Sequence, residues 1–133
     1  MTRIVLVRHG QTEWNRVERF RGRADVPLNE TGLAQAEATG RRVASEWQPV
    51  CVYSSPLSRA VKTAEAIARH FDLPVHVHPG LADIDYGEWQ GLTPDEVEEH
   101  WPGLLTPGTM RRTQPASPAV KRWTTCARAA WRR

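Results

Sequence analysis

The sequence has few cysteines and no long apolar run, and both shortages exclude classes of protein. Its 133 residues include two cysteines, Cys51 and Cys126, which form neither a metal-ligand spacing nor a disulfide framework. No apolar run approaches the ~20 residues of a membrane-spanning helix. The first apolar run has four residues and ends at Arg8, unlike a signal peptide. We therefore expect one cytoplasmic domain, long enough to bury a core.

Acidic residues are missing from the end of the chain. Residues 104–133 hold seven Arg or Lys side chains and no Asp or Glu, whereas residues 1–103 hold eleven basic and fifteen acidic side chains. The net charge of +3 and the pI near 9.3 therefore come from the tail. Because the body is mildly acidic, its charge does not indicate a nucleic-acid-binding domain.

The opening stretch combines an apolar run with groups that suit phosphate chemistry. Residues 4–7 (IVLV) predict a buried strand, and Arg8, His9 and Gly10 follow directly. Ligands of open α/β sheets bind at the carboxyl ends of strands. Arg binds phosphate through a bidentate fork, and His can act as a nucleophile or an acid/base. The pattern fits a phosphate site, although by itself it also fits a solvated strand end.

Helices and short strands alternate through the body. Asn29 is a candidate N-cap for a helix that ends before Pro49, and residues 50–53 predict a second strand. Ser55 is expected to cap a second helix that starts at Pro56, and residues 73–78 predict a third strand. The expected core face of the first helix comprises Leu33, Ala36, Gly40, Val43, Ala44 and Trp47. This alternation predicts an α/β fold with a parallel, doubly wound sheet.

Charged side chains lie in the connecting segments. Arg59 falls in the first turn of the second helix, where free amide groups favour an anion. Residues 15–29 predict a loop, and residues 81–92 predict an acidic loop before a capping box that opens a short helix from Thr93 to about Trp101. Three arginines of the first loop, which either line an anion site or lie in solvent, are Arg19, Arg21 and Arg23.

Two histidines share one face of the third expected strand, because side chains alternate along a strand. His76 and His78 could hold a metal ion as a pair. The sequence offers no third ligand at a suitable spacing, so an exposed strand face is the better interpretation.

Four motifs occur in a specific order. They are residues 8–15 (RHGQTEWN), residues 28–36 (LNETGLAQA), residues 54–64 (SSPLSRAVKTA) and residues 87–93 (GEWQGLT). Residues 3–103 thereby resemble the histidine phosphatase superfamily, the phosphoglycerate mutase-like proteins. The resemblance implies a three-layer αβα fold with a mainly parallel central sheet, incomplete here at its carboxyl end.

The resemblance also implies roles for named residues. His9 would take a phosphoryl group on a ring nitrogen, and Arg8 and Arg59 would clamp the phosphate oxygens, supplying charge and orientation. Asp83 stands where the family usually has a Glu that protonates the leaving oxygen, which requires a protonated, partly buried carboxyl group. Other implied substrate contacts are Gly10, Gln11, Thr12, Asn15, Arg21 and Gly22. No metal or cofactor is implied, and the expected partner is a small phosphorylated substrate.

Three features depart from the family pattern. Arg21 replaces the Gln of many phosphatase members, and Asp83 is one methylene shorter than Glu, so Asp85 and Glu88 are rival acids. The family's second histidine and the late strand before it are missing, because no histidine follows His100. We therefore expect a phosphate monoesterase of impaired activity. The alternatives are mutase-type phosphoryl transfer and a non-catalytic phosphate-binding remnant.

Residues 104–133 form an off-pattern basic tail. It could bind nucleic acid or a membrane, it could be disordered, or it could be translated out of frame. With G/C-rich codons, a shifted frame recodes residues 116–127 as Phe-Pro-Gly-Gly-Glu-Thr-Leu-Asp-Asp-Val-Arg, and its first five residues resemble a family segment. We favour a frame slip near Leu105 and Thr106 and expect neither a nucleic-acid nor a membrane partner. Sequencing of the encoding DNA past codon 105 tests this hypothesis.

Overall fold

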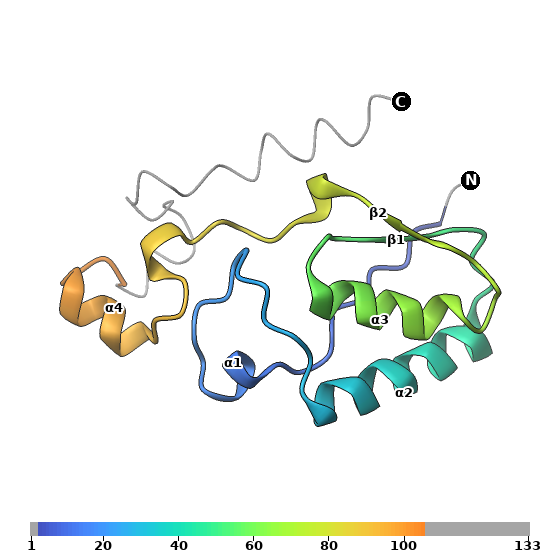
Figure 1. Ribbon diagram of the computed structural model, residues 1–133, viewed down its shortest axis with the longest axis horizontal. Coiled ribbons are helices and arrows are strands. Elements are labelled where there is room, and N and C mark those ends of the chain that lie inside the picture. Colours follow the sequence, from blue (N-terminus) through green and yellow to red (C-terminus); the bar gives the residue numbers. More distant parts are fainter. Residues whose placement is uncertain (1–2, 106–133) are drawn as a thin grey trace.

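The computed structural model describes residues 3–105 (Figure 1). The elements in chain order are α1 (Glu13–Arg16), α2 (Glu30–Glu46), β1 (Val52–Ser54), α3 (Ser58–Ala68), β2 (Val75–Val77) and α4 (Pro94–His100), with 3₁₀ turns at Pro79–Leu81 and Gly87–Trp89. The fold is α/β, as the alternating pattern predicts. The tail beyond residue 105, with the frame-slip hypothesis that concerns it, lies outside the described residues.

The sheet of the described region consists of β1 and β2, which run parallel with Val52 opposite Val75. Helix α3 makes the crossover between them and packs against both strands. In Figure 1 the two strands lie on one side of α3 and helix α2 lies on the other. The strands predicted at residues 50–53 and 73–78 are confirmed, although each forms over only three residues.

Helices α2 and α3 pack closely through small side chains. A Cβ atom on Gly40 would lie 2.4 Å from the backbone oxygen of Ala66, so a larger residue there would push the helices apart. Ala36 and Val43 are buried on the same stripe of α2. The expectation that Leu33 and Ala44 belong to the core is wrong, since Leu33 is 47% exposed and Ala44 is exposed as well. Around the helix, Leu33 lies at one edge of the buried stripe that contains Gly32 and Ala36, so its side chain is only partly covered.

The start of α3 differs from the sequence prediction. The helix begins at Ser58, and the hydroxyl oxygen of Ser55 accepts a 3.4 Å hydrogen bond from the Leu57 N–H without capping the helix. Asp25, from the 15–29 loop, accepts a 2.8 Å hydrogen bond from the Ser58 N–H. Hydrogen bonds from the Ser58 side chain and backbone hold the pKa of Asp25 below its usual value. A distant carboxylate thus caps the helix, and local sequence could not reveal it.

The opening segment does not form the predicted buried strand. Residues 4–7 have no strand assignment, and the exposed fractions are 63% for Ile4, 43% for Val5, 92% for Leu6 and 42% for Val7. A strand needs a neighbour for its backbone hydrogen bonds. Within residues 3–105 the sheet contains β1 and β2 alone, so the apolar run stays extended and unpaired.

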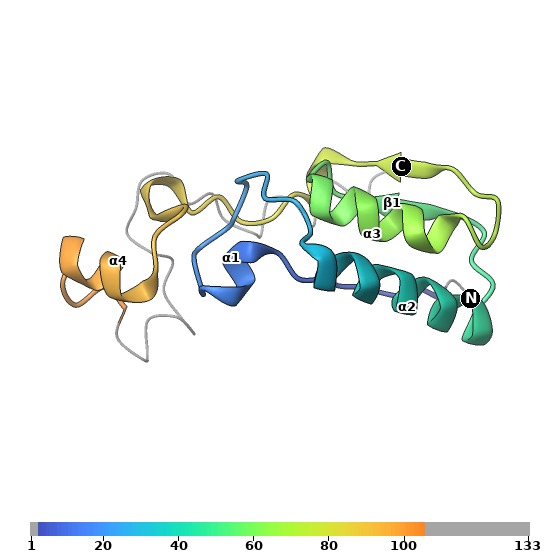
Figure 2. The ribbon, with the colours of Figure 1, turned by 60° about the horizontal axis from the view of Figure 1, so that its bottom comes forward.

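A second cluster of apolar residues lies around α4. Trp89 is buried, with ring-centroid distances of 5.6 Å to Phe20 and 6.3 Å to Trp101. The predicted capping box is confirmed, because Thr93 and Glu96 exchange side-chain and backbone hydrogen bonds. Figures 1 and 2 show α4 at the end of the described region opposite to β1 and β2, with α1 between.

The possible metal-binding histidine pair and a membrane-spanning helix can both be examined in the described part of the chain. His76 and His78 are both exposed, and residues 3–105 hold no group of three or more side chains that could ligate a metal ion. None of the helices in this part is both long and apolar enough to span a membrane.

Candidate active site

The turn at His9 and Gly10 is held by helices that follow it in the chain. The Gly10 N–H donates a 3.3 Å hydrogen bond to the Thr63 hydroxyl oxygen, and that hydroxyl donates to the Arg59 carbonyl at 2.8 Å. A Cβ atom on Gly10 would lie 2.2 Å from the carbonyl oxygen of Gly32. Only glycine therefore fits between α2 and α3 at this point, and the turn fixes the position of His9.

The His9 ring has one nitrogen engaged and one available. Its Nδ1 atom lies 2.7 Å from the Gly10 carbonyl oxygen. Because a carbonyl can only accept, we assign the ring hydrogen to Nδ1, which leaves the lone pair on Nε2. Burial and the charges of Arg59, Arg21 and Arg8 lower the pKa of His9, against the opposing effect of the Gly10 hydrogen bond. The ring is thus neutral near pH 7, the form that a nucleophile requires.

Arg59 is a buried cation fixed by backbone oxygens. Its side chain is 1% exposed, and its two terminal nitrogens donate hydrogen bonds of 2.7 Å to the carbonyls of Ala24 and Gly22. Burial lowers the pKa of Arg59, while the charge of Asp83 opposes that shift. Gly22 has φ +50°, and a Cβ there would lie 2.6 Å from the Ile84 carbonyl oxygen. The 15–29 loop is thereby closed onto Arg59 and onto the 81–92 loop.

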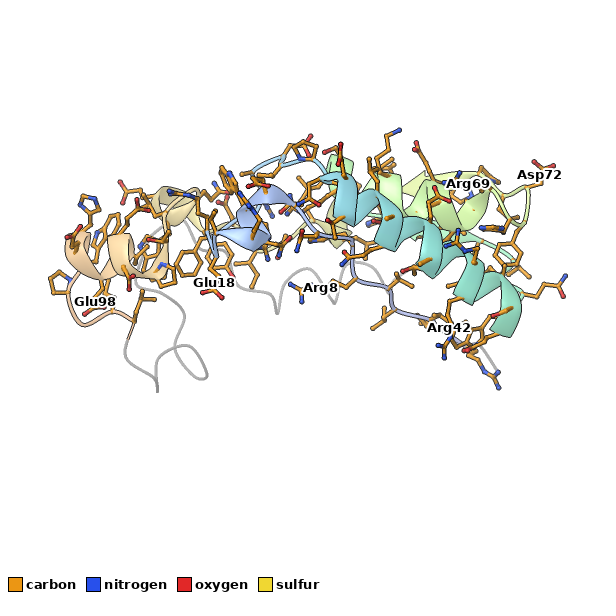
Figure 3. All side chains as sticks on the ribbon, turned by 90° about the horizontal axis from the view of Figure 1, so that it is seen from below. Arg8, Glu18, Arg42, Arg69, Asp72 and Glu98 are labelled. Atoms are coloured by element: carbon orange, nitrogen blue, oxygen red, sulfur yellow. The ribbon has the colours of Figure 1, made fainter. Side chains whose placement is uncertain are left out.

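The four predicted catalytic residues all line one cavity of about 410 Å³. They are Arg8, His9, Arg59 and Asp83. Their placement differs within it. The Arg8 side chain is exposed and extends outward in Figure 3, whereas Arg59 is buried. Most of the apolar remainder of the lining comes from the opening segment, β1 and α3, and α2 adds Val43.

Among the three candidate acids, Asp83 alone is paired with Arg59. Its Oδ2 atom lies 3.6 Å from an Arg59 terminal nitrogen, and its side chain is 44% exposed. Asp85 instead accepts a hydrogen bond from the Gly87 N–H, and Glu88 is exposed. An ion pair stabilises the charged carboxylate, whereas a proton donor must be protonated. The acid role of Asp83 stays a prediction.

Three of the predicted substrate contacts serve the local fold. The Gln11 N–H donates to the Gln35 side chain at 2.8 Å, and the Gln11 side chain accepts from Asn29 at 3.0 Å. Thr12 is fully buried and forms a capping box with Asn15 at the start of α1. These bonds hold the loop after His9 in place. Substrate contact by Gln11, Thr12 and Asn15 stays a prediction.

The three arginines of the 15–29 loop have different surroundings. Arg19 pairs with Glu96 at 3.0 Å, and Arg23 donates to the Asp83 carbonyl at 3.3 Å. The Nε atom of Arg21 is buried with no hydrogen-bond partner among the described residues, and its charge acts on His9. Arg21 is thus the arginine of this loop that influences the nucleophile.

Sequence reasoning missed two residues that organise the site. Thr63 joins the His9 turn to α3, and Asp25 joins the 15–29 loop to the same helix. Thr63 lies one helical turn after Arg59, a spacing that places both on one face, so that signal was available. Asp25 carries no comparable local signal.

Comparison with known proteins identifies the family. The sequence model described as "Histidine phosphatase superfamily (branch 1)" matches residues 4–132. The chain therefore belongs to the histidine phosphatase superfamily. The described residues bring the family's arginine-histidine-glycine turn together with a buried arginine from α3, as the four motifs predict.

Relatives and solved structures agree with this assignment. The metal-independent phosphoserine phosphatase of Arabidopsis thaliana is 45% identical over 103 residues, which are 77% of this chain and 43% of that protein. A structure of mycobacterial glucosyl-3-phosphoglycerate phosphatase with VO3 matches at TM-score 0.68 and 37% identity, covering 71% of this chain and 45% of that chain. "Mycobacterial hydrolase 2" matches at TM-score 0.81 and 31% identity, covering 92% and 53%. This chain thus spans about half the length of its relatives.

Proposed function

We propose that this protein binds the phosphate monoester of a small metabolite and transfers the phosphoryl group to Nε2 of His9. The observation that carries the proposal is the His9 ring itself. Its Nδ1–H is engaged by the Gly10 carbonyl, and a buried Arg59 lines the same cavity. The membership of the chain in a phosphatase superfamily supports the same chemistry.

The proposed reaction has two steps. The Nε2 lone pair of His9 attacks phosphorus, the bond from phosphorus to the ester oxygen breaks, and that oxygen takes the proton of Asp83 to leave as an alcohol. Water then attacks the phosphohistidine while the Asp83 carboxylate takes its proton, and the bond from phosphorus to Nε2 breaks, which returns the lone pair to His9 and releases phosphate. Arg59 and Arg8 offset charge on the transferring group, which is the main requirement of phosphoryl transfer.

The second step is expected to be slow in this chain. No histidine follows His100, so the second histidine of the family pattern is not available to stabilise the transferring group. Loss of one such electrostatic donor typically lowers a rate by roughly 10²–10³. We therefore propose a phosphatase of little activity that retains its nucleophile. The cytoplasmic location expected from the sequence also stays a prediction.

Two alternatives use the same site. A mutase would return the phosphoryl group to a second hydroxyl, and a phosphate-binding remnant would bind the substrate without reacting. We favour hydrolysis because the 15–29 loop carries no mutase-like signature. The substrates named for relatives, phosphoserine and glucosyl-3-phosphoglycerate, make small phosphorylated metabolites the class to test.

Release of phosphate from p-nitrophenyl phosphate and from phosphoserine tests the proposal. We expect only trace turnover by the 133-residue chain, lost in His9→Ala and kept in His100→Ala, whose target lies on α4. Rapid turnover that depends on His9 would contradict the predicted impairment. Turnover unchanged in His9→Ala would contradict the assignment of the nucleophile.

A further inference from the structure

We propose that Gln35 and Thr63 are positioning residues, which together hold the His9 ring with its hydrogen on Nδ1 and its Nε2 lone pair free. Neither residue is among the substrate contacts that the family resemblance implies. The inference rests on the proposed function, because it concerns how His9 is prepared to attack phosphorus. It is based on hydrogen bonds from two helices to the two peptide units on either side of Gly10.

The peptide unit between His9 and Gly10 is held by α3. Its N–H, which belongs to Gly10, donates a 3.3 Å hydrogen bond to the Thr63 hydroxyl oxygen. That hydroxyl has one hydrogen, which it donates to the Arg59 carbonyl at 2.8 Å, so towards Gly10 it can only accept. Thr63 is buried, at 4% exposure. Its side chain therefore sets where the backbone of His9 lies relative to that of Arg59.

The next peptide unit, between Gly10 and Gln11, is held by α2. Its N–H belongs to Gln11 and donates a 2.8 Å hydrogen bond to Oε1 of Gln35. Its carbonyl oxygen belongs to Gly10 and lies 2.7 Å from Nδ1 of His9. Because the N–H and C=O groups share one rigid plane, the bond to Gln35 also fixes the direction of the carbonyl that meets the His9 ring. Bonds in such a chain polarise one another, which strengthens the carbonyl as an acceptor.

The direction of the Gly10 carbonyl decides the tautomer of His9. With the carbonyl in place, a hydrogen on Nδ1 is bonded, whereas a lone pair on Nδ1 would face the lone pairs of the oxygen. If the carbonyl turned away, either ring nitrogen would carry the hydrogen, and fewer molecules would have a free Nε2. The peptide unit has no room to shift towards α2, because a Cβ atom on Gly32 would already overlap the Gln11 carbonyl.

A role in the local fold alone is the alternative for both residues. In that case, loss of either hydrogen bond would lower the free energy of unfolding but leave the His9 tautomer as it is. The two roles are separated by measuring the ring and the fold in the same variants.

A ¹⁵N NMR spectrum of the His9 ring in the full 133-residue chain tests the proposal. At about pH 8, where the ring is neutral, we expect the hydrogen of the parent chain on Nδ1. Gln35→Met and Thr63→Val remove an acceptor without a large change of side-chain size, and each should give a mixture of the two tautomers. Gln35→Glu and Thr63→Ser keep an acceptor and should restore the parent spectrum.

Transfer of label from ³²P-phosphoserine to His9 measures the same positioning chemically. Gln35→Met and Thr63→Val should each slow labelling by about tenfold or more, since a displacement of about 1 Å can slow a reaction roughly 10²-fold. Arg41→Met, an exposed substitution on the same helix, is the matched control and should leave the tautomer and the labelling rate unchanged. Far-ultraviolet circular dichroism of each variant checks the fold.

Four outcomes would overturn the proposal. They are a parent chain with its hydrogen on Nε2, a hydrogen that stays on Nδ1 in Gln35→Met, an equal change in Arg41→Met, and no recovery in Gln35→Glu. Gln35 is exposed, so these outcomes stand even if Thr63→Val does not fold. A parent chain that takes no label would contradict the proposed function alone, because the tautomer is measured without phosphoryl transfer.

Discussion

The opening segment and the β1–α3 segment share one sequence plan but have different structures. Each has four consecutive apolar residues, followed directly by an arginine in the opening segment and after a polar turn by an arginine in the β1–α3 segment. In the β1–α3 segment the run pairs with β2 and leads to the buried Leu57 and Arg59. In the opening segment the run is unpaired, and Leu6 is 92% exposed. The difference teaches that an apolar run becomes a strand only where a neighbouring strand completes its hydrogen bonds.

The candidate site joins these two segments. His9 comes from the unpaired one and Arg59 from the ordered one, and the bond from the Gly10 N–H to Thr63 connects them. The nucleophile therefore depends on a contact with the ordered segment for its position. Variants on each side of this contact should affect stability to different degrees.

The largest effect is expected in the ordered segment. Arg59→Ala would leave the carbonyls of Gly22 and Ala24 without their buried donor, and it should lower the free energy of unfolding by about 3 kcal/mol. Urea denaturation measures this change. Arg42→Ala, which removes an exposed ion pair with Glu46, should stay within about 0.5 kcal/mol. Equal losses in the two variants would show that Arg59 does not anchor the loop.

A smaller effect is expected where the two segments meet the helices. Gly10→Ala would place a Cβ atom 2.2 Å from the Gly32 carbonyl oxygen, so the turn would have to move away from α2. We expect a loss of about 1–3 kcal/mol and displaced amide resonances around His9. A variant with unchanged spectra and stability would mean that the turn is not confined. Ala44→Gly serves as the exposed helical control and should cost about 1 kcal/mol.

Removal of the single bond between the segments is expected to have a smaller effect still. Thr63→Val keeps the shape of the side chain but leaves the Gly10 N–H without an acceptor, which should cost about 1 kcal/mol. Thr39→Val, at an exposed site on α2 where the hydroxyl bonds within its own helix, is the matched control. If the two variants lose equal stability, the segments are not coupled through Thr63.

The smallest effect is the pH dependence contributed by His9. Its pKa in the folded chain lies below the ordinary 6.5, chiefly because of burial, so below that pH the unfolded chain binds more protons. Stability from this group is complete above pH 6.5 and is lost as the pH falls through the lowered pKa. The free energy of unfolding should therefore fall less on acidification in His9→Gln than in the parent chain.

Removal of the Arg21 charge should also change the pKa of His9. Its positive charge lowers the pKa of His9, so Arg21→Gln should raise that pKa in an NMR titration of the His9 ring. An unchanged titration would place Arg21 too far from His9 to influence it. Arg16→Gln, which removes an exposed cation paired with Glu13, should leave the titration as it is.

Local chemistry explains which parts of the fold the sequence could predict. The Asn29 cap of α2, the Thr93 capping box and the Arg59 position in the first turn of α3 depend on residues within a few positions of each other. The start of α3 depends on Asp25, which lies more than thirty residues earlier. The fate of residues 4–7 depends on a neighbouring strand. Such long-range partners are not encoded in periodicity or capping patterns.

The site was predictable to a similar extent. The family resemblance indicates His9, Arg8, Arg59 and Asp83, and all four line one cavity. The sequence could not show that Asp83 pairs with Arg59, that Arg8 extends outward or that Arg21 acts on His9. The contact of Asp83 with Arg59 joins positions 24 residues apart, and the effect of Arg21 on His9 joins positions 12 residues apart, which local patterns do not encode.

Trapping of the phosphoryl group tests the central claim most directly. The 133-residue chain is mixed with ³²P-labelled phosphoserine, quenched in alkali to preserve phosphohistidine, and digested for mass spectrometry. We predict one acid-labile label, on His9, that is absent in His9→Ala and retained in His100→Ala. A chain that acquires no label, or a label that persists in His9→Ala, would contradict the assignment of His9 as the phosphoryl acceptor.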